Sequence, residues 1–197
     1  MGTRMIIGVI DGGDWRVAQY CNSFEDEPEY QGKLLLDCLK TNLTNIYENL
    51  SHCRFVAKYG DDTAATEEYP TFDSSLGVDV FDEIIACDKY DTVWLCDSRS
   101  FLDDELSCGF AFIINYDTGK LTCYHHGRKF LFGEYDLENL PVIDMLIADY
   151  EASIALHKKE TQRIAYAPMI DLIRERAVEN GLDPDEEERN FWLRIES

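Results

Sequence analysis

The chain contains 197 residues, of which 18 are lysine or arginine and 39 are aspartate or glutamate, so its formal net charge is −21. A hydrophobic content of 45% is enough to build a core, which excludes global disorder despite this charge. No apolar run approaches the roughly 20 residues that a membrane-spanning helix needs, and no secretory signal is visible. Because such an acidic surface repels phosphate groups, we expect neither nucleic acid nor an anionic membrane as a partner.

The predicted elements begin with a β-hairpin over residues 4–20. Residues 4–10 are mostly apolar, Gly12 and Gly13 supply a tight turn, and residues 15–20 return with alternating side chains. A polar, acidic loop follows the hairpin.

Residues 33–50 predict a helix because leucines and one isoleucine recur at spacings of three and four, which places them on one face. These residues are Leu36, Leu39, Leu43, Ile46 and Leu50. Three further elements are predicted from composition: a strand at 52–57, a helix at 76–87 and a buried strand at 92–96. Residues 60–70 are expected to be the least structured.

A second hairpin is predicted over residues 110–124, with a turn at Asp117-Thr118-Gly119-Lys120 that suits a type I turn with a glycine bulge. The rest of the chain predicts helices alone. The first covers residues 140–156, the second opens at Pro168 and ends at Asn180-Gly181, and the last runs from Asp183 through Trp192.

Paired strands without regular strand–helix alternation indicate an α+β fold. We predict an antiparallel β-sheet that is built from hairpins and covered by helices, with a C-terminal helical segment. Residues 1–160 are expected to form the α+β core domain. Residues 161–197 are expected to form a helical extension packed on the same domain.

The seven cysteines include no CxxC pair, and most lie within apolar runs. This pattern favours buried free thiols in a reducing cytoplasm over a disulfide framework. Cysteine and histidine residues around the second hairpin lack the close pairs of zinc sites, and no glycine-rich phosphate loop precedes a helix. We therefore predict neither a metal nor a cofactor.

More than half of the negative excess lies in residues 59–108, which contain 14 acidic and two basic side chains. We expect a non-enzymatic interaction protein that binds and occludes a basic, nucleic-acid-binding surface of a partner protein, a nucleic-acid mimic with carboxylates in place of phosphates. This hypothesis requires the acids to form one continuous patch. The residues predicted to bind the partner are Asp61, Asp62, Glu67, Glu68, Asp79, Asp82, Glu83, Asp103, Asp104 and Glu105.

Two alternatives stay open. One is a small hydrolase or transferase with its site between the two hairpins, formed by Gln19, Cys21, Asp26 and His125, although acidic surroundings raise a thiol's pKa and so disfavour the reactive thiolate. The other is an acidic domain whose charge serves solubility and that has no electrostatic partner.

Several short motifs resemble an uncharacterised family of small proteins found in phages, bacteria and some fungi. The motifs are Val17-Ala18-Gln19-Tyr20, Pro28-Glu29-Tyr30-Gln31-Gly32, Leu76-Gly77, Ser107-Cys108, Asp117-Thr118-Gly119-Lys120-Leu121 and Asp136-Leu137-Glu138-Asn139-Leu140-Pro141. They cover residues 4–150 in patches. The family's first loop carries Trp, Asp, Gly and Tyr where this chain has Phe24-Glu25-Asp26-Glu27.

The resemblance implies a shared fold but no catalytic residue, because no activity is established for the family. It also implies a phage or mobile-element setting. In that setting a small acidic protein is expected to bind and inhibit a host protein.

Overall fold

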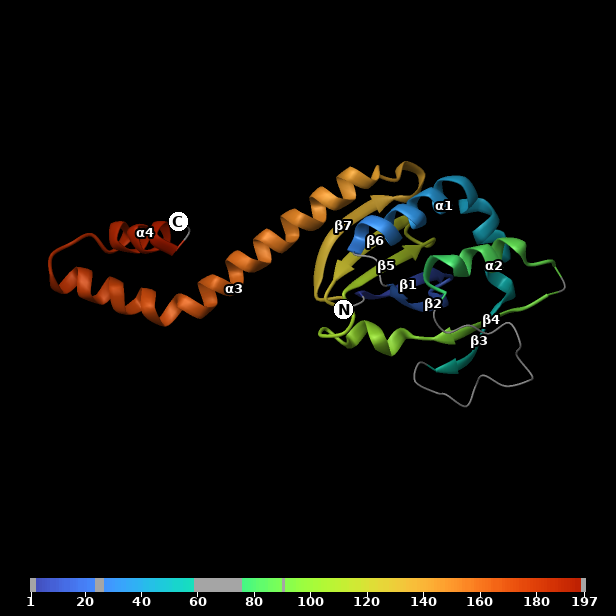
Figure 1. The fold of residues 1–197 in the computed structure, drawn as a ribbon, viewed down its shortest axis with the longest axis horizontal. Coiled ribbons are helices and arrows are strands. Elements are labelled where there is room, and N and C mark those ends of the chain that lie inside the picture. Colours follow the sequence, from blue (N-terminus) through green and yellow to red (C-terminus); the bar gives the residue numbers. More distant parts are fainter. Residues whose placement is uncertain (1–2, 24–26, 59–75, 90, 196–197) are drawn as a thin grey trace. The chain divides into compact units, whose positions relative to one another are not determined.

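The computed structural model describes residues 3–23, 27–58, 76–89 and 91–195 (Figure 1). The chain divides into two compact units, Met1–Ser153 and Ile154–Ser197, and the boundary between them lies within one long helix. The predicted boundary at residues 160 and 161 also falls in this helix. Within the described ranges, no helix combines the length and the apolar character that crossing a bilayer requires.

The strands are β1 (Thr3–Asp11), β2 (Asp14–Ser23), β3 (Cys53–Lys58), β4 (Val93–Asp97), β5 (Phe110–Asn115), β6 (Lys120–His125) and β7 (Phe130–Asp136). The α-helices are α1 (Glu27–Asn49), α2 (Val80–Ala86), α3 (Ile143–Glu179) and α4 (Pro184–Ile195). Four 3-10 segments connect them: η1 (Leu50–His52), η2 (Gly77–Asp79), η3 (Arg99–Asp103) and η4 (Leu137–Asn139). The predicted α+β class is confirmed.

Five strands form one sheet in the order β2-β1-β5-β6-β7, and β3 and β4 form a second sheet of two strands. Both predicted hairpins are confirmed, as β1–β2 and β5–β6. The five-stranded sheet is mostly antiparallel, as predicted, but β1 pairs parallel with β5, and in the second sheet β3 pairs parallel with β4. The first strands of the two hairpins run side by side in the same direction, so the hairpins form one continuous sheet.

The expectation that only helices follow the second hairpin is also wrong, because β7 pairs antiparallel with β6. β7 lies at the edge of the sheet and exposes Leu131 and Glu134, so its apolar pattern is weak. It also contains Gly133, which a strand usually disfavours. A Cβ at this position would lie 2.5 Å from the Tyr135 hydroxyl, so any larger residue would displace the Tyr135 side chain.

Pro168 does not open a helix but lies inside α3, which runs without interruption through it. A proline in a helix removes one main-chain hydrogen bond, and here the residues on both sides remain helical. The predicted stop at Gly181 is confirmed by its positive φ of 71°. The predicted last helix is also confirmed, and the Asp183 carboxylate accepts a hydrogen bond from the Asp185 N–H at its start.

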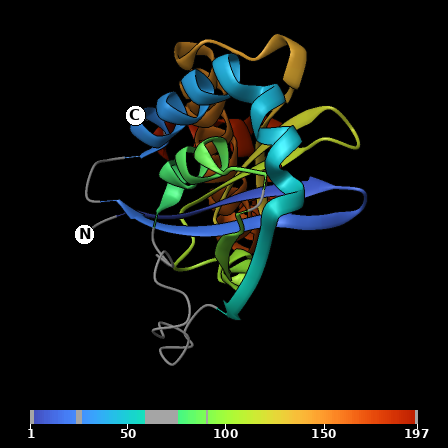
Figure 2. The same ribbon diagram turned by 90° about the vertical axis from the view of Figure 1, so that its right-hand side faces the viewer.

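The two faces of the five-stranded sheet pack against different elements (Figure 2). α1 and α2 cover one face, and the predicted leucine stripe of α1 lies in this larger core, with Leu39 and Ile46 fully buried. The opposite face packs against η3, where the Tyr20 and Phe101 rings form a T-shaped pair with their centroids 5.0 Å apart. These faces determine where each predicted site residue lies.

The second unit consists of the later part of α3 and of α4. Tyr166 contacts the aromatic rings of Phe191 and Trp192, with ring centroids 5.6 and 6.1 Å apart. Arg174 forms ion pairs with Asp185 and Glu188 of α4. These contacts join the two helices.

Candidate functional site

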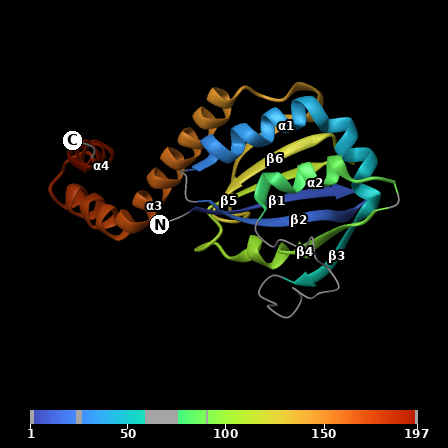
Figure 3. The same ribbon diagram turned by 45° about the vertical axis from the view of Figure 1, so that its right-hand side comes forward.

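An acidic groove lies between α1 and α2, which run beside each other over the sheet (Figure 3). Its volume is about 380 Å³. Its lining consists of Leu34, Asp37, Cys38, Thr41 and Asn42 from α1, and of Val78, Asp79 and Asp82 from η2 and α2. On α1 the lining residues recur at spacings of three and four, so this helix presents one row of side chains to the groove. The opposite side is formed by Val78 and Asp79 of η2 and by Asp82 of α2.

The groove combines an apolar floor with a rim of carboxylates. Leu34 and Val78 belong to the core beneath it, whereas Asp37, Asp79 and Asp82 are exposed. Within the described parts of the chain, none of these three carboxylates forms an ion pair with a basic side chain. In the part of the chain that the structure describes, the negative charge of the groove therefore has no basic side chain to balance it.

Burial and a carboxylate of the groove both affect the pKa of Cys38. Burial is the main cause that raises the pKa of this thiol, and the Asp82 carboxylate raises it further. A hydrogen bond involving Asn42 acts in the opposite direction. A carboxylate of α2 therefore acts across the groove on a side chain of α1.

The carboxylates of residues 103–105, which were predicted to bind the partner, form ion pairs and hydrogen bonds within the protein. Asp103 pairs with Arg128 at 2.7 Å, and Glu105 pairs with Lys129 at 2.5 Å. The carboxylate of Asp104 accepts hydrogen bonds from the main-chain N–H groups of residues 106 and 107, which closes a turn, and the Ser107 bonds lower its pKa. Charge reversal in this loop would remove internal contacts first.

The predicted acids do not form one continuous patch among the described residues. Asp79, Asp82 and Glu83 belong to η2 and α2 on one face of the sheet. Asp103 ends η3 on the opposite face, and Asp104 and Glu105 follow it. Four others, Asp61, Asp62, Glu67 and Glu68, lie outside the described residues, as does Asp26.

The residues of the enzymatic alternative are not brought together. Gln19 and Cys21 lie on β2, and His125 lies on β6. Cys21 is opposite Met5, Met5 is opposite Phe110, and Phe110 is opposite His125, so three interstrand steps separate the thiol from the imidazole. At about 4.8 Å per step the backbones are about 14 Å apart, and the strands between them fill the space where a cleft between the hairpins was expected.

Cys21 and His125 each lie in a separate buried environment. Burial raises the pKa of Cys21 to about 11, and the Asp79 carboxylate contributes to this rise. Nε2 of His125 is 2.9 Å from the Ser153 hydroxyl oxygen, and its ring stacks on Phe130 at 5.0 Å. His125 therefore lies in an aromatic cluster with residues of β7 and α3, away from the Cys21 thiol.

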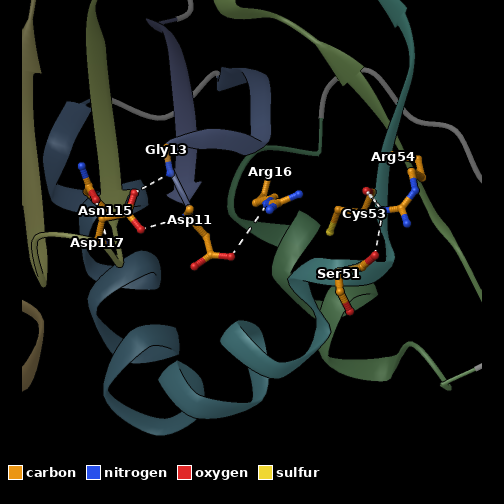
Figure 4. Close-up of polar contacts among 9 residues, drawn as sticks. Asp11, Gly13, Arg16, Ser51, Cys53, Arg54, Asn115 and Asp117 are labelled. Carbon is orange, nitrogen blue, oxygen red and sulfur yellow. Dashed lines mark hydrogen bonds and ion pairs between the residues drawn. The ribbon is translucent and has the colours of Figure 1, made fainter.

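A second hollow of about 700 Å³ lies at the turn end of hairpin β1–β2 (Figure 4). Its lining combines three arginines, three acids and three aromatic residues with Ser51 and Cys53. The charged residues are Arg16, Arg54, Arg99, Asp11, Asp14 and Glu48, and the aromatic residues are Trp15, Tyr47 and Phe55. Together they come from β1, β2, the end of α1, β3 and η3.

Sequence reasoning missed Asp37 of the groove and all of the second hollow. Asp37 could have been found, because it lies on the exposed side of α1 next to the leucine stripe. The second hollow gives no local signal, since its lining residues come from positions 11–16, 47–55 and 99. In the described residues, no cluster of three or more His, Cys, Asp or Glu side chains could hold a metal ion.

Comparisons of the chain with protein-family models, with curated proteins and with solved structures give no significant match.

Proposed function

We propose that this protein is a non-enzymatic interaction protein that binds a basic segment of a partner protein in the α1–α2 groove. The observation that carries the proposal is the set of exposed carboxylates, Asp37, Asp79 and Asp82, which lie over an apolar floor and form no ion pair with any described residue. The net charge of −21 adds a long-range attraction for a basic partner.

The groove has the two features that a lysine or arginine side chain needs. The aliphatic stem of such a side chain can lie along Leu34 and Val78 while its cationic end reaches the carboxylates. A guanidinium group would form charge-assisted hydrogen bonds with them. A partner surface rich in such side chains is also one that binds nucleic acid, so occupancy of the groove would occlude it.

This proposal narrows the predicted binding set. Asp79 and Asp82 stay in it, and Glu83 on the same helix contributes charge beside the groove. Residues 103–105 are no longer included in the binding set, because their carboxylates form ion pairs and hydrogen bonds within the protein.

The test compares two variants that each remove two negative charges. Asp79→Asn with Asp82→Asn changes the groove, and Asp103→Asn with Glu105→Gln is the matched control on the opposite face. Each protein is immobilised and exposed to cell lysate at about 50 and about 500 mM salt, because ionic strength weakens binding between exposed charges. We expect a basic protein that the wild type and the control retain at low salt, and that the groove variant loses.

Capture of the same proteins by all three chains would contradict the proposal, as would retention that does not depend on salt. The first result would place any binding outside the groove, and the second would favour an acidic domain without an electrostatic partner.

A further inference from the structure

Arg16 is aimed into the second hollow by a β-bulge. Val9 pairs with Val17 and Ile10 pairs with Trp15, so Arg16 is the extra residue between them and has no partner on β1. A bulge turns a side chain away from the regular alternation of a strand, and bulges are frequent next to functional sites. Arg16 lines the hollow, and Figure 4 shows its side chain reaching toward Asp11.

Arg16 has one hydrogen-bond donor for which the described residues provide no acceptor. Its Nε atom is buried and has no hydrogen-bond partner there. The nearest carboxylate oxygen, from Asp11, is 3.8 Å away, which is within range for an ion pair but too far for a hydrogen bond. An unsatisfied buried donor is costly, so a native structure that keeps one needs a reason, such as a bound ion or ligand.

Arg54 supplies further donors to the same hollow. Its Nη1 atom donates to the carbonyl oxygens of Ser51 and Cys53, both at 2.7 Å, which fixes one side of the guanidinium group (Figure 4). The guanidinium group has five N–H donors in a rigid fork, so this anchoring leaves others for a ligand. Both Arg16 and Arg54 are near enough to Cys53 to lower its pKa, although burial raises that pKa to about 12 overall.

The other walls are suited to a small organic molecule. Arg99 is held by Asp97 and lies over the Phe55 ring, with 5.6 Å between its guanidinium carbon and the ring centroid. Trp15 and Phe55 give the hollow two aromatic surfaces. Asp14 and Glu48 can accept hydrogen bonds from hydroxyl groups, and their charges would repel a polyanion such as a nucleic acid.

We propose that the hollow lined by Arg16, Arg54 and Trp15 binds a small phosphate ester, with its phosphate on the two arginines and its organic part against the aromatic wall. Phosphate suits this site because paired arginines bind it through several charge-assisted hydrogen bonds. A volume of about 700 Å³ has room for a molecule of nucleotide size. The proposal does not depend on the function of the α1–α2 groove.

The experiment titrates the full-length protein with adenosine 5′-monophosphate, ribose 5-phosphate and adenosine. Tryptophan fluorescence and calorimetry measure binding, and Trp15→Phe removes the nearby reporter. We expect both phosphate esters to bind and adenosine not to bind. Arg16→Gln and Arg54→Gln should each weaken binding at least about tenfold, since each removes charged hydrogen bonds. Arg16→Lys should restore part of the affinity.

Arg128→Gln is the matched control, because Arg128 is an exposed arginine that pairs with Asp103 outside the hollow. It should leave binding unchanged. Arg54 is exposed, so its variant is expected to fold even if changes at Arg16 disturb the hairpin. Equal binding of adenosine and its monophosphate, unchanged affinity in Arg54→Gln, or no binding of either ester at millimolar concentration would each overturn the proposal.

Discussion

The carboxylate of Asp117, in the turn between β5 and β6, accepts a hydrogen bond of 2.8 Å from the main-chain N–H of Gly13 in the turn between β1 and β2 (Figure 4). Its second oxygen accepts the N–H of Gly12 at 2.7 Å. Both glycines have positive φ and form the turn between the paired residues Asp11 and Asp14, so their N–H groups lie outside the strand pairing. The single Asp117 carboxylate thus connects the two hairpin turns to each other.

Replacing Asp117 should loosen this connection. Asp117→Ala removes both acceptors, and we expect a loss of about 1–2 kcal/mol in the free energy of unfolding, reduced from the full strength of charged hydrogen bonds because the site is exposed. Asp117→Asn keeps one acceptor oxygen and should lose less. Urea denaturation of the three proteins measures the difference. A stability for Asp117→Ala within error of the wild type would show that the turns are held by the strands alone.

Gly127 and Gly119 have nearly the same backbone conformation, with φ of 65° and 66°, but different surroundings. A Cβ at Gly127 would lie 2.3 Å from the carbonyl oxygen of Leu102, whereas a Cβ at Gly119 would meet nothing within 4 Å. Gly119→Ala should therefore cost only the conformational penalty of about 1–2 kcal/mol. Gly127→Ala adds a clash with main chain that cannot move freely, so we expect a clearly larger loss or a failure to fold.

Thermal unfolding of these two variants separates backbone strain from steric exclusion. If both alanine variants lost the same amount of stability, the close approach of the 102–104 segment to the β6–β7 turn would not hold in solution.

The α1 stripe offers a test of the core. Leu39 is 1% exposed and packs against the sheet, so Leu39→Ala should cost about 2–5 kcal/mol through lost burial and a remaining cavity. Leu156 is 68% exposed on α3, and Leu156→Ala should change stability by less than about 0.5 kcal/mol. Chemical denaturation of both variants checks the contrast. Similar costs at the two positions would mean that Leu156 is covered in solution.

The predictable part of the fold is the part with local periodic signals. The β1–β2 hairpin follows from the two glycines of its turn, and α1 follows from leucines at helical spacing, although α1 begins at Glu27, six residues before the predicted start at 33. The parallel pairing of β1 with β5 has no such signal, because about a hundred residues separate the partners. β7 was missed because an edge strand with one exposed face does not show a strong apolar pattern.

The candidate sites were harder to predict than the fold for the same reason. The charge density of the sequence placed the partner-binding site in residues 59–108. It could not show that Asp103 forms an ion pair with Arg128, whereas Asp79 forms none with any described residue. That distinction depends on contacts between segments distant in sequence. The bulge at Arg16 likewise depends on the register of two strands, which the sequence of one strand does not determine.

The buried thiols predict how stability depends on alkaline pH. Burial raises the pKa of Cys21 to about 11 and the pKa values of Cys53 and Cys108 to about 12. In the unfolded chain these thiols ionise near their ordinary pKa of about 8.5. The folded state then holds more protons than the unfolded state, so the free energy of unfolding falls as pH rises from about 9 toward 11. Each such thiol contributes up to about 1.4 kcal/mol per pH unit in this range.

Denaturation in the presence of a reductant at pH 7.5, 9 and 10.5 measures this fall. Cys108 is fully buried and Cys87 is only partly buried, so Cys108→Ala and Cys87→Ala form a matched pair. Lysine and tyrosine residues titrate alike in both variants, so the difference between their pH slopes reports the thiols. We expect the slope to become shallower in Cys108→Ala and to change much less in Cys87→Ala. Equal slopes in the two variants would show that the Cys108 thiol ionises as readily in the folded chain as in the unfolded one, which its position between β5 and the β6–β7 turn does not allow.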